Sequence, residues 1–252
     1  MKSYNIGSRS GDSRWLEGGN PWLLWLCCLL ASVNPAQAEI ALEDGFESGS
    51  FASSWGQTAG VTIQTTGGAK GTTNFARLAP STAGTGRELG ARFDGVAPGG
   101  AKDFTVDLYF RVQNTTQRQF NLQVSTSTGG ISSSGASINL KYDVTNGWAA
   151  FSTVWNPISG LGSITPGEWY GLRVSGQDWG TAAARWAVSV SAAGGTNFIN
   201  SATNLTWFQA GTATSLPARY FVFTTVYGNS PGFDVDEVTA SVIPPPPPVP
   251  PA

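Results

Sequence analysis

Histidine is absent from this 252-residue chain, and charged residues make up only 12% of it. Because histidine is the commonest general base and metal-binding imidazole, its absence argues against serine-type and zinc-type hydrolysis. Lysine and arginine together number 14 against 16 acidic residues, which gives a formal charge of −2. A chain without a basic surface has little with which to hold phosphates, so nucleic acid is not an expected partner.

Cysteine occurs only twice, as the adjacent pair Cys27 and Cys28. Both lie in the apolar run 22–33, which is too short to span a bilayer and has the length of a signal-peptide core. An Ala-Gln-Ala sequence ends at Ala38, so we expect residues 1–38 to be a signal peptide that is removed. The mature chain would then be secreted, to the extracellular space or the periplasm. Without cysteine, it would depend on its hydrophobic core rather than on disulfides.

Glycine is abundant, with 32 residues, and aromatic residues make up 12% of the chain. Short apolar stretches separated by Gly, Ser, Asn and Pro indicate strands and turns rather than helices. The clearest strand is expected at 103–112, where apolar and polar residues alternate strictly. Segments 118–126 and 137–144 repeat this alternation. The Asn-Gly pair at 146–147 predicts a hairpin with a return strand at 148–155.

Further strands are expected toward the C-terminus, and they complete an all-β pattern. They cover 168–175, 184–191, 205–209, 219–225 and 233–242. No break in composition divides the chain, so residues 39–243 predict one antiparallel β-sandwich domain. The proline-rich residues 244–252 predict an extended tail or linker. No apolar helix follows the domain, so we expect no membrane anchor. We expect the protein to be a monomer.

Three segments resemble the concanavalin A-like lectin and glucanase superfamily, including its laminin-G-like jelly rolls and bacterial carbohydrate-binding modules. They are residues 43–49 (EDGFESG) with Trp55, residues 166–174 (PGEWYGLRV) and residues 233–238 (FDVDEV). Their order and spacing extend over nearly the whole mature chain. The resemblance implies a two-sheet jelly roll whose first and last strands are neighbours. It also implies a concave face, which in the relatives holds sugars.

The polar positions of the three alternating segments form the first candidate binding surface. Amides, carboxylates and a guanidinium can hydrogen-bond vicinal hydroxyls, and an aromatic ring can stack on a pyranose. The residues are Asp107, Tyr109, Arg111, Gln119, Asn121, Gln123, Asn139, Lys141 and Asp143. Because the three segments share one alternation, we interpret these side chains as one sugar-binding face. A solvated sheet face is the alternative.

Three tryptophans are candidate stacking surfaces for a sugar ring. Trp155, Trp179 and Trp207 each lie beside residues typical of turns, which favours exposure. Aromatic residues supply much of the core of a β protein, so packing at the rim of the core is the alternative.

Acidic residues gather at both ends of the expected domain. They are Glu43, Asp44 and Glu47 at the first strand and Asp234, Asp236 and Glu237 at the last. If these strands are neighbours, a Ca²⁺ ion would relieve the repulsion between the carboxylates. The resemblance implies a structural calcium at the positions that match Glu47 and Asp236, and Asp44 is the third expected ligand. Ordinary surface charge, with N–H contacts to turns, is the alternative.

Catalysis is not expected from this sequence. The glucanases of the superfamily use a Glu-x-Asp-x-x-Glu or Glu-x-Asp-x-Glu strand, which places two carboxylates on one face. The nearest segment, 234–237 (DVDE), begins with Asp and would direct Glu237 away from Asp236. The alginate-lyase-like relatives need a Gln-x-His strand, which this chain lacks.

We therefore expect a secreted, non-catalytic carbohydrate-binding module whose partner is a glycan or cell-surface polysaccharide. One alternative is a structural or adhesive surface protein without a glycan site. A divergent polysaccharide hydrolase or lyase is the other.

Overall fold

The computed structural model describes residues 37–80, 86–113, 118–127, 136–143, 146–209, 211–225 and 232–243. Residues 1–36 and the proline-rich tail lie outside this part of the chain. Regular structure in the described residues is almost entirely strand. Two short 3₁₀ helices, η1 (Ala69–Gly71) and η2 (Gly211–Thr214), are the exceptions there. No helix among the described residues is long and apolar enough to cross a membrane.

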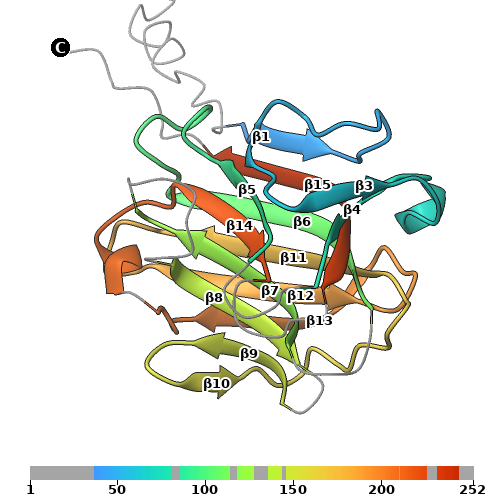
Figure 1. Ribbon diagram of the computed structural model, residues 1–252. Coiled ribbons are helices and arrows are strands. Elements are labelled where there is room, and N and C mark those ends of the chain that lie inside the picture. Colours follow the sequence, from blue (N-terminus) through green and yellow to red (C-terminus); the bar gives the residue numbers. More distant parts are fainter. Residues whose placement is uncertain are drawn as a thin grey trace, which may run out of the picture. The chain divides into compact units, whose positions relative to one another are not determined.

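The strands form two antiparallel sheets, shown in Figure 1. The eight-stranded sheet consists of β1 (Glu39–Asp44), β3 (Val61–Gln64), β4 (Phe75–Leu78), β6 (Asp103–Val112), β11 (Tyr170–Gln177), β12 (Arg185–Ser191), β13 (Phe198–Leu205) and β15 (Phe233–Ile243). The seven-stranded sheet consists of β2 (Trp55–Gln57), β5 (Glu88–Arg92), β7 (Arg118–Ser125), β8 (Ala136–Asp143), β9 (Gly147–Phe151), β10 (Trp155–Pro157) and β14 (Tyr220–Thr224). The expected fold class, a two-sheet antiparallel β-sandwich, is confirmed.

The first and last strands are neighbours in the eight-stranded sheet. β1 pairs with β15, with Glu39 opposite Val242 and Asp44 opposite Val238. On its other side β15 pairs with β6 along most of its length. The sequence predicts this adjacency correctly, and it places the two ends of the domain side by side.

Aromatic rings connect the two sheets through one hydrophobic core. Phe110 of β6 lies 4.8 Å from Phe120 of β7, and Phe120 lies 5.0 Å from Phe233 of β15, measured between ring centroids. Phe93, which follows β5, contacts Phe104 of β6 at 5.2 Å. All five rings are almost completely buried. Large aromatic surfaces in mutual contact contribute strongly to a core of this kind, which matters in a domain without disulfides.

Two strands differ from the sequence prediction. The return strand expected at 148–155 ends at Phe151, and after a short turn β10 forms a second hairpin with β9. The strand expected at 205–209 lies earlier, as β13. β13 is the edge strand of its sheet, and only half-buried and exposed residues alternate along it. An edge strand with few apolar residues gives little periodic signal, so its position could not be predicted.

Candidate functional site

The polar face expected from three alternating segments is divided between the two sheets. Asp107, Tyr109 and Arg111 belong to β6 in the eight-stranded sheet, whereas the polar residues of β7 and β8 belong to the seven-stranded sheet. The apolar residues of all three strands point into the same core, so the two polar sets lie on opposite outer surfaces. The expectation of one continuous face is therefore wrong. Gln119 lies in β7, but its side chain is outside what the structure describes.

The polar residues of β6 are bound to other parts of the chain. Arg173 donates to both carboxylate oxygens of Asp107, at 2.6 and 2.8 Å. Arg111 donates to Asp234, at 2.9 and 3.0 Å. Tyr109 is only 9% exposed and lies under the ammonium of Lys70, 4.9 Å from the ring centroid.

Burial, together with the negative charges of Glu237 and Asp107, raises the pKa of the Tyr109 hydroxyl. Because the Tyr109 ring is buried and Lys70 lies over it, this ring is not available to stack on a ligand.

The outer surface of the seven-stranded sheet carries the second polar set. Asn121 of β7 is opposite Lys141 of β8, and Gln123 is opposite Asn139. We call the following outward side chains the polar face: Glu88, Asn121, Gln123, Asn139, Lys141, Asp143, Trp155 and Thr224. Asn121, Gln123, Asn139, Lys141, Asp143 and Thr224 are all at most 6% exposed. These groups are polar but desolvated, so each needs a hydrogen-bond partner.

Three amide side chains are hydrogen-bonded in a row on this face, and other amide atoms beside them have no partner among the described residues. Asn121 Nδ2 donates to Asn139 Oδ1 at 2.8 Å, and Asn139 Nδ2 donates to Gln209 Oε1 at 2.8 Å. Gln123, which is completely buried, has no partner for either amide atom among the described residues, and Asn121 Oδ1 has none there either. A buried amide atom without a partner costs about 1–3 kcal/mol.

Lys141 and Asp143 form a buried ion pair at one side of the polar face. Lys141 Nζ donates to Asp143 Oδ2 at 2.5 Å and lies 4.3 Å from the centroid of the Trp155 ring. Asp143 Oδ1 also accepts the backbone N–H of Asn146 at 2.6 Å. Burial by itself would raise the pKa of Asp143. The hydrogen bonds from Lys141 and Asn146, with the ammonium charge, outweigh burial and hold that pKa below its usual value.

Glu88 lies on β5, on the other side of the polar face. Its carboxylate accepts a hydrogen bond from the Gln57 side chain. Burial raises the pKa of Glu88, and the hydrogen bond from Gln57 partly offsets that rise. Sequence reasoning missed this residue. The signal was the alternation of residues 88–93, where Leu89, Ala91 and Phe93 are buried in the core.

The three candidate tryptophans have different environments. Trp155 is half-buried on the polar face, in contact with Phe151 at 5.1 Å. Trp207 is half-buried against the core. Trp179 is completely buried, so the expectation that it is exposed is wrong. The cause is Gly176, because a Cβ at that position would lie only 2.7 Å from Trp179 Nε1, so glycine leaves room for the indole.

Asp44, the first expected calcium ligand, binds the turn that follows β1. Its Oδ1 accepts the backbone N–H of Phe46 at 2.8 Å. Its Oδ2 accepts the backbone N–H of Ala52 at 2.9 Å and the indole N–H of Trp55 at 2.8 Å.

Glu47 and Asp236 bind the loop between β3 and β4. Glu47 accepts the backbone N–H groups of Thr73 and Asn74, at 2.9 and 2.6 Å. Asp236 Oδ2 accepts the Ala69 N–H at 2.7 Å and the Thr72 hydroxyl at 2.8 Å, while Oδ1 accepts the Glu237 N–H at 2.8 Å. Burial raises the pKa of Asp236 to about 6, despite these hydrogen bonds.

These three carboxylates do not fit a shared calcium site. The carboxylate oxygens of Asp44, Glu47 and Asp236, which a cation would need, already accept hydrogen bonds from N–H and O–H groups. In the described part of the chain, no three acidic, histidine or cysteine side chains lie together. The alternative from the sequence, N–H contacts to turns, agrees with this geometry.

Residues 207–209 and 211–212 are described parts of the chain, and Gln209 and Thr212 among them contact the seven-stranded sheet beside the polar face. The Gln209 N–H donates to the Ser137 carbonyl at 2.7 Å, and Thr126 donates to the Thr212 hydroxyl at 2.7 Å. Other segments adjoin the ends of β5, β7, β8, β9 and β14 in sequence, and these lie outside the described residues. They are 81–85, 114–117, 128–135, 144–145 and 226–231.

Comparison with known proteins identifies solved structures that have a similar fold. No protein-family model and no curated protein sequence matches the chain. A carbohydrate esterase from the Shiga toxin-encoding bacteriophage phi24B has a TM-score of 0.55 at 13% identity, covering 82% of this chain and 99% of its own. The carbohydrate recognition domain of Emp46p has a TM-score of 0.51 at 10% identity, covering 83% and 99%.

An endo-β-1,4-glucuronan lyase from the fungus Trichoderma reesei is similar to the same extent. Its TM-score is 0.50 at 11% identity, covering 81% of this chain and 96% of its own. At such identities the likeness concerns the fold. The chain therefore shares the two-sheet β-sandwich fold of these solved structures.

Proposed function

We propose that this protein binds carbohydrate on the polar face of its seven-stranded sheet. The observation that carries the proposal is the amide of Gln123, which is fully buried at the centre of the face with neither polar atom paired among the described residues. A ligand that supplies the missing hydrogen bonds would account for such a costly group. The primary amide offers two donors and one acceptor, which suits adjacent hydroxyl groups.

The neighbours of Gln123 extend the same chemistry across the face. Asn121 Oδ1 is a second unpaired acceptor, and Asn139 continues the row of amides. Trp155 is half-buried beside Lys141, where its ring can pack against the apolar side of a sugar. Amide groups combined with one aromatic ring favour a polyhydroxylated ligand over an ion or an apolar molecule.

The structural relatives support carbohydrate as the ligand class. Their names describe a carbohydrate esterase, a glucuronan lyase and a carbohydrate recognition domain. We further propose that the partner is an extracellular glycan or cell-surface polysaccharide, because residues 1–38 have the pattern of a signal peptide.

We propose binding without hydrolysis. Glu88 on β5 and Asp143 on β8 are the carboxylates of the polar face, and two further strands, β14 and β7, separate them. Strands are about 4.8 Å apart, so these carboxyl groups are about 14 Å apart or more. Glycoside hydrolysis needs a separation of about 5–10 Å. Asp143 is also held by Lys141, which leaves it unavailable as a nucleophile.

The test replaces Gln123 with leucine, which has a similar volume and no polar atoms. We expect Gln123→Leu to weaken glycan binding at least tenfold, because about two hydrogen bonds to the ligand are lost. We also expect the variant to unfold at higher urea concentration than the wild type, because an unpaired amide has been removed. A glycan array followed by calorimetric titration measures the first effect, and urea denaturation measures the second.

Gln64→Leu is the matched control. Gln64 lies on β3, in the other sheet, and its side chain bonds Thr62. This variant should bind like the wild type. Unchanged affinity in Gln123→Leu for a glycan that the wild type binds would refute the site. The absence of any glycan ligand would leave the structural or adhesive alternative.

A further inference from the structure

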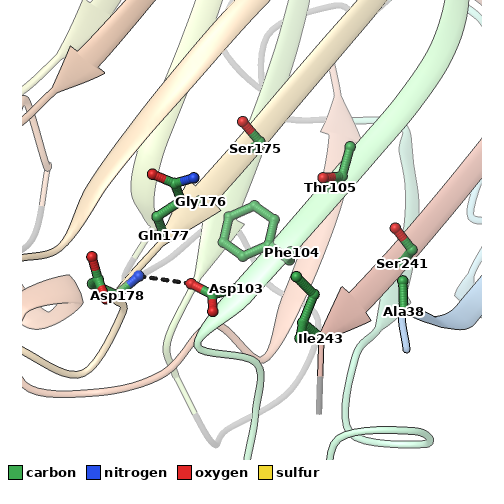
Figure 2. Close-up of a pocket in the computed structure, with 10 residues that line it drawn as sticks. All are labelled: Ala38, Asp103, Phe104, Thr105, Ser175, Gly176, Gln177, Asp178, Ser241 and Ile243. Carbon is green, nitrogen blue, oxygen red and sulfur yellow. Dashed lines mark hydrogen bonds between the residues drawn. The ribbon is translucent and has the colours of Figure 1, made fainter. Parts of the chain in front are cut away.

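A shallow trough crosses the outer surface of the eight-stranded sheet, on the side of the sandwich opposite the polar face. Its floor consists of small side chains in direct register on four neighbouring strands, because Ser241 is opposite Thr105, Thr105 is opposite Ser175, and Ser175 is opposite Ala187. Figure 2 shows Thr105, Ser175 and Ser241 in this row. Small residues in register make a depression that runs across the strands.

Longer polar side chains border the floor on both sides. On one side, Arg173 and Asp107 form their two-point ion pair. On the other side, Asp103 accepts the backbone N–H of Asp178 at 2.9 Å, which Figure 2 marks, and Gln177 lies next to it. Residues two apart along a strand are about 6.8 Å apart, so these borders are separated by about 14 Å.

Two cavities lie along the trough and meet at Ser175 and Gln177. The first has a volume of about 410 Å³ and also contacts Asp103, Thr105 and Ser241. The second has about 140 Å³ and extends the trough over Arg185 to Thr203 of β13. Together they reach from β15 to β13, across five strands, which corresponds to about 19 Å. This shape suits an extended chain lying across the sheet.

The groups that line the trough define the chemistry of the ligand. The hydroxyls of Thr105, Ser175 and Ser241 and the amide of Gln177 have no hydrogen-bond partner among the described residues, so they are free to bond hydroxyl groups. Arg185 is neutralised by Asp178 at 2.7 Å. The charge of Asp103 is left without a cationic partner in the described structure, which disfavours a polyanion.

We propose that the trough is a second carbohydrate site, and that it binds a neutral polysaccharide chain running across the strands. A protein partner fits less well. Among the described residues that line the trough, Ile243 is the only large apolar side chain that is exposed. The backbone of the trough floor is already paired within the sheet. The proposal does not depend on the polar face, because it rests on different residues in a different sheet.

The test screens a soluble β-glucan, a mannan and a xylan by affinity electrophoresis, with alginate as the anionic comparison. Oligosaccharides of the retained polymer are then titrated by calorimetry. We expect two sites per chain in the wild type. Ser175→Lys places a long charged side chain on the floor and should remove one site, and Gln177→Ala should weaken that site about tenfold.

Ser201→Lys is the matched control, since it adds the same side chain on the same sheet, on β13 outside both cavities. It should keep both sites. Circular dichroism should show the wild-type spectrum for all variants.

The outcomes separate the two sites. If Gln123→Leu removes one site and Ser175→Lys the other, both proposals hold. If Ser175→Lys changes nothing in either the wild type or Gln123→Leu, the trough proposal is wrong. If Ser175→Lys abolishes all binding and Gln123→Leu none, the trough stands and the polar-face proposal fails. Stronger binding of alginate than of neutral polymers, or a wild-type dimer that Ser175→Lys dissociates, would also overturn the trough proposal.

Discussion

Lys141 and Asp143 of the polar face form a buried ion pair, so each charge depends on the other for its stability. Both side chains are only 7% exposed, and each is the close charged partner of the other. We expect Lys141→Met to lower the free energy of unfolding by about 3–5 kcal/mol at pH 7, because it leaves a buried carboxylate without a countercharge. Urea denaturation measures this loss. The double variant Lys141→Met/Asp143→Asn should recover most of the lost stability.

The same pair gives the protein a defined response to acid. The pKa of Asp143 in the folded protein lies below its usual value of 3.8. A carboxyl group whose pKa is lowered by folding stabilises the protein above the unfolded pKa, and this contribution disappears as the pH falls through the folded pKa. As the pH falls from about 5 to about 2, urea denaturation should show a steeper loss in the wild type than in Asp143→Asn.

Arg173→Met is the control for both experiments. The Arg173 and Asp107 side chains are 47% and 32% exposed, so breaking their pair should cost no more than about 1 kcal/mol. Equal losses in Lys141→Met and Arg173→Met would mean that burial does not govern the Lys141 pair.

The loop between β3 and β4 is the element that replaces an expected calcium site with direct hydrogen bonds. Asp236 of β15 accepts two of them, from Ala69 and Thr72 of the loop, and it accepts a third hydrogen bond from Glu237 of its own strand. We expect the melting temperature to be the same in EDTA and in millimolar Ca²⁺. Asp236→Ala should lower stability by about 3 kcal/mol or more under both conditions, because hydrogen bonds to a charged group are lost.

Differential scanning calorimetry distinguishes this expectation from calcium binding. A ligand that binds only the folded state raises the melting temperature by mass action. If Ca²⁺ raises the melting temperature and Asp236→Ala abolishes this increase, the protein binds the calcium ion that the sequence resemblance implies.

The strictly alternating strands were predictable from the sequence, but the sheet to which each belongs was not. β6, β7 and β8 were expected within one or two residues of their bounds, because strict alternation indicates a strand with one buried face. The alternation is identical whichever sheet a strand joins, so it gave no sign that β6 and β7 lie in different sheets. The same limit explains the site: Asn121, Gln123, Asn139 and Lys141 were predicted together, whereas Glu88 comes from a strand distant in sequence.

At the scale of the whole molecule, both sheets share one core, and we expect them to unfold together. Phe120 of the seven-stranded sheet contacts Phe110 and Phe233 of the eight-stranded sheet, so neither sheet keeps its buried surface without the other. Thermal unfolding followed by far-ultraviolet circular dichroism and by tryptophan fluorescence should give coincident single transitions. Two separable transitions would show that residues 39–243 are not one cooperative unit.

The pairing of β1 with β15 also determines how the domain would respond to a mechanical load. Glu39 and Val242 are opposite each other, so a force that separates the two ends acts on this hydrogen-bonded pair first. In this antiparallel arrangement the load breaks the inter-strand hydrogen bonds one after another, as a zipper opens, instead of shearing them all at once. The domain would therefore yield easily when stretched between its ends. If the domain were attached at one end alone and held its ligand on a sheet face, the force would not act on the pairing of β1 with β15.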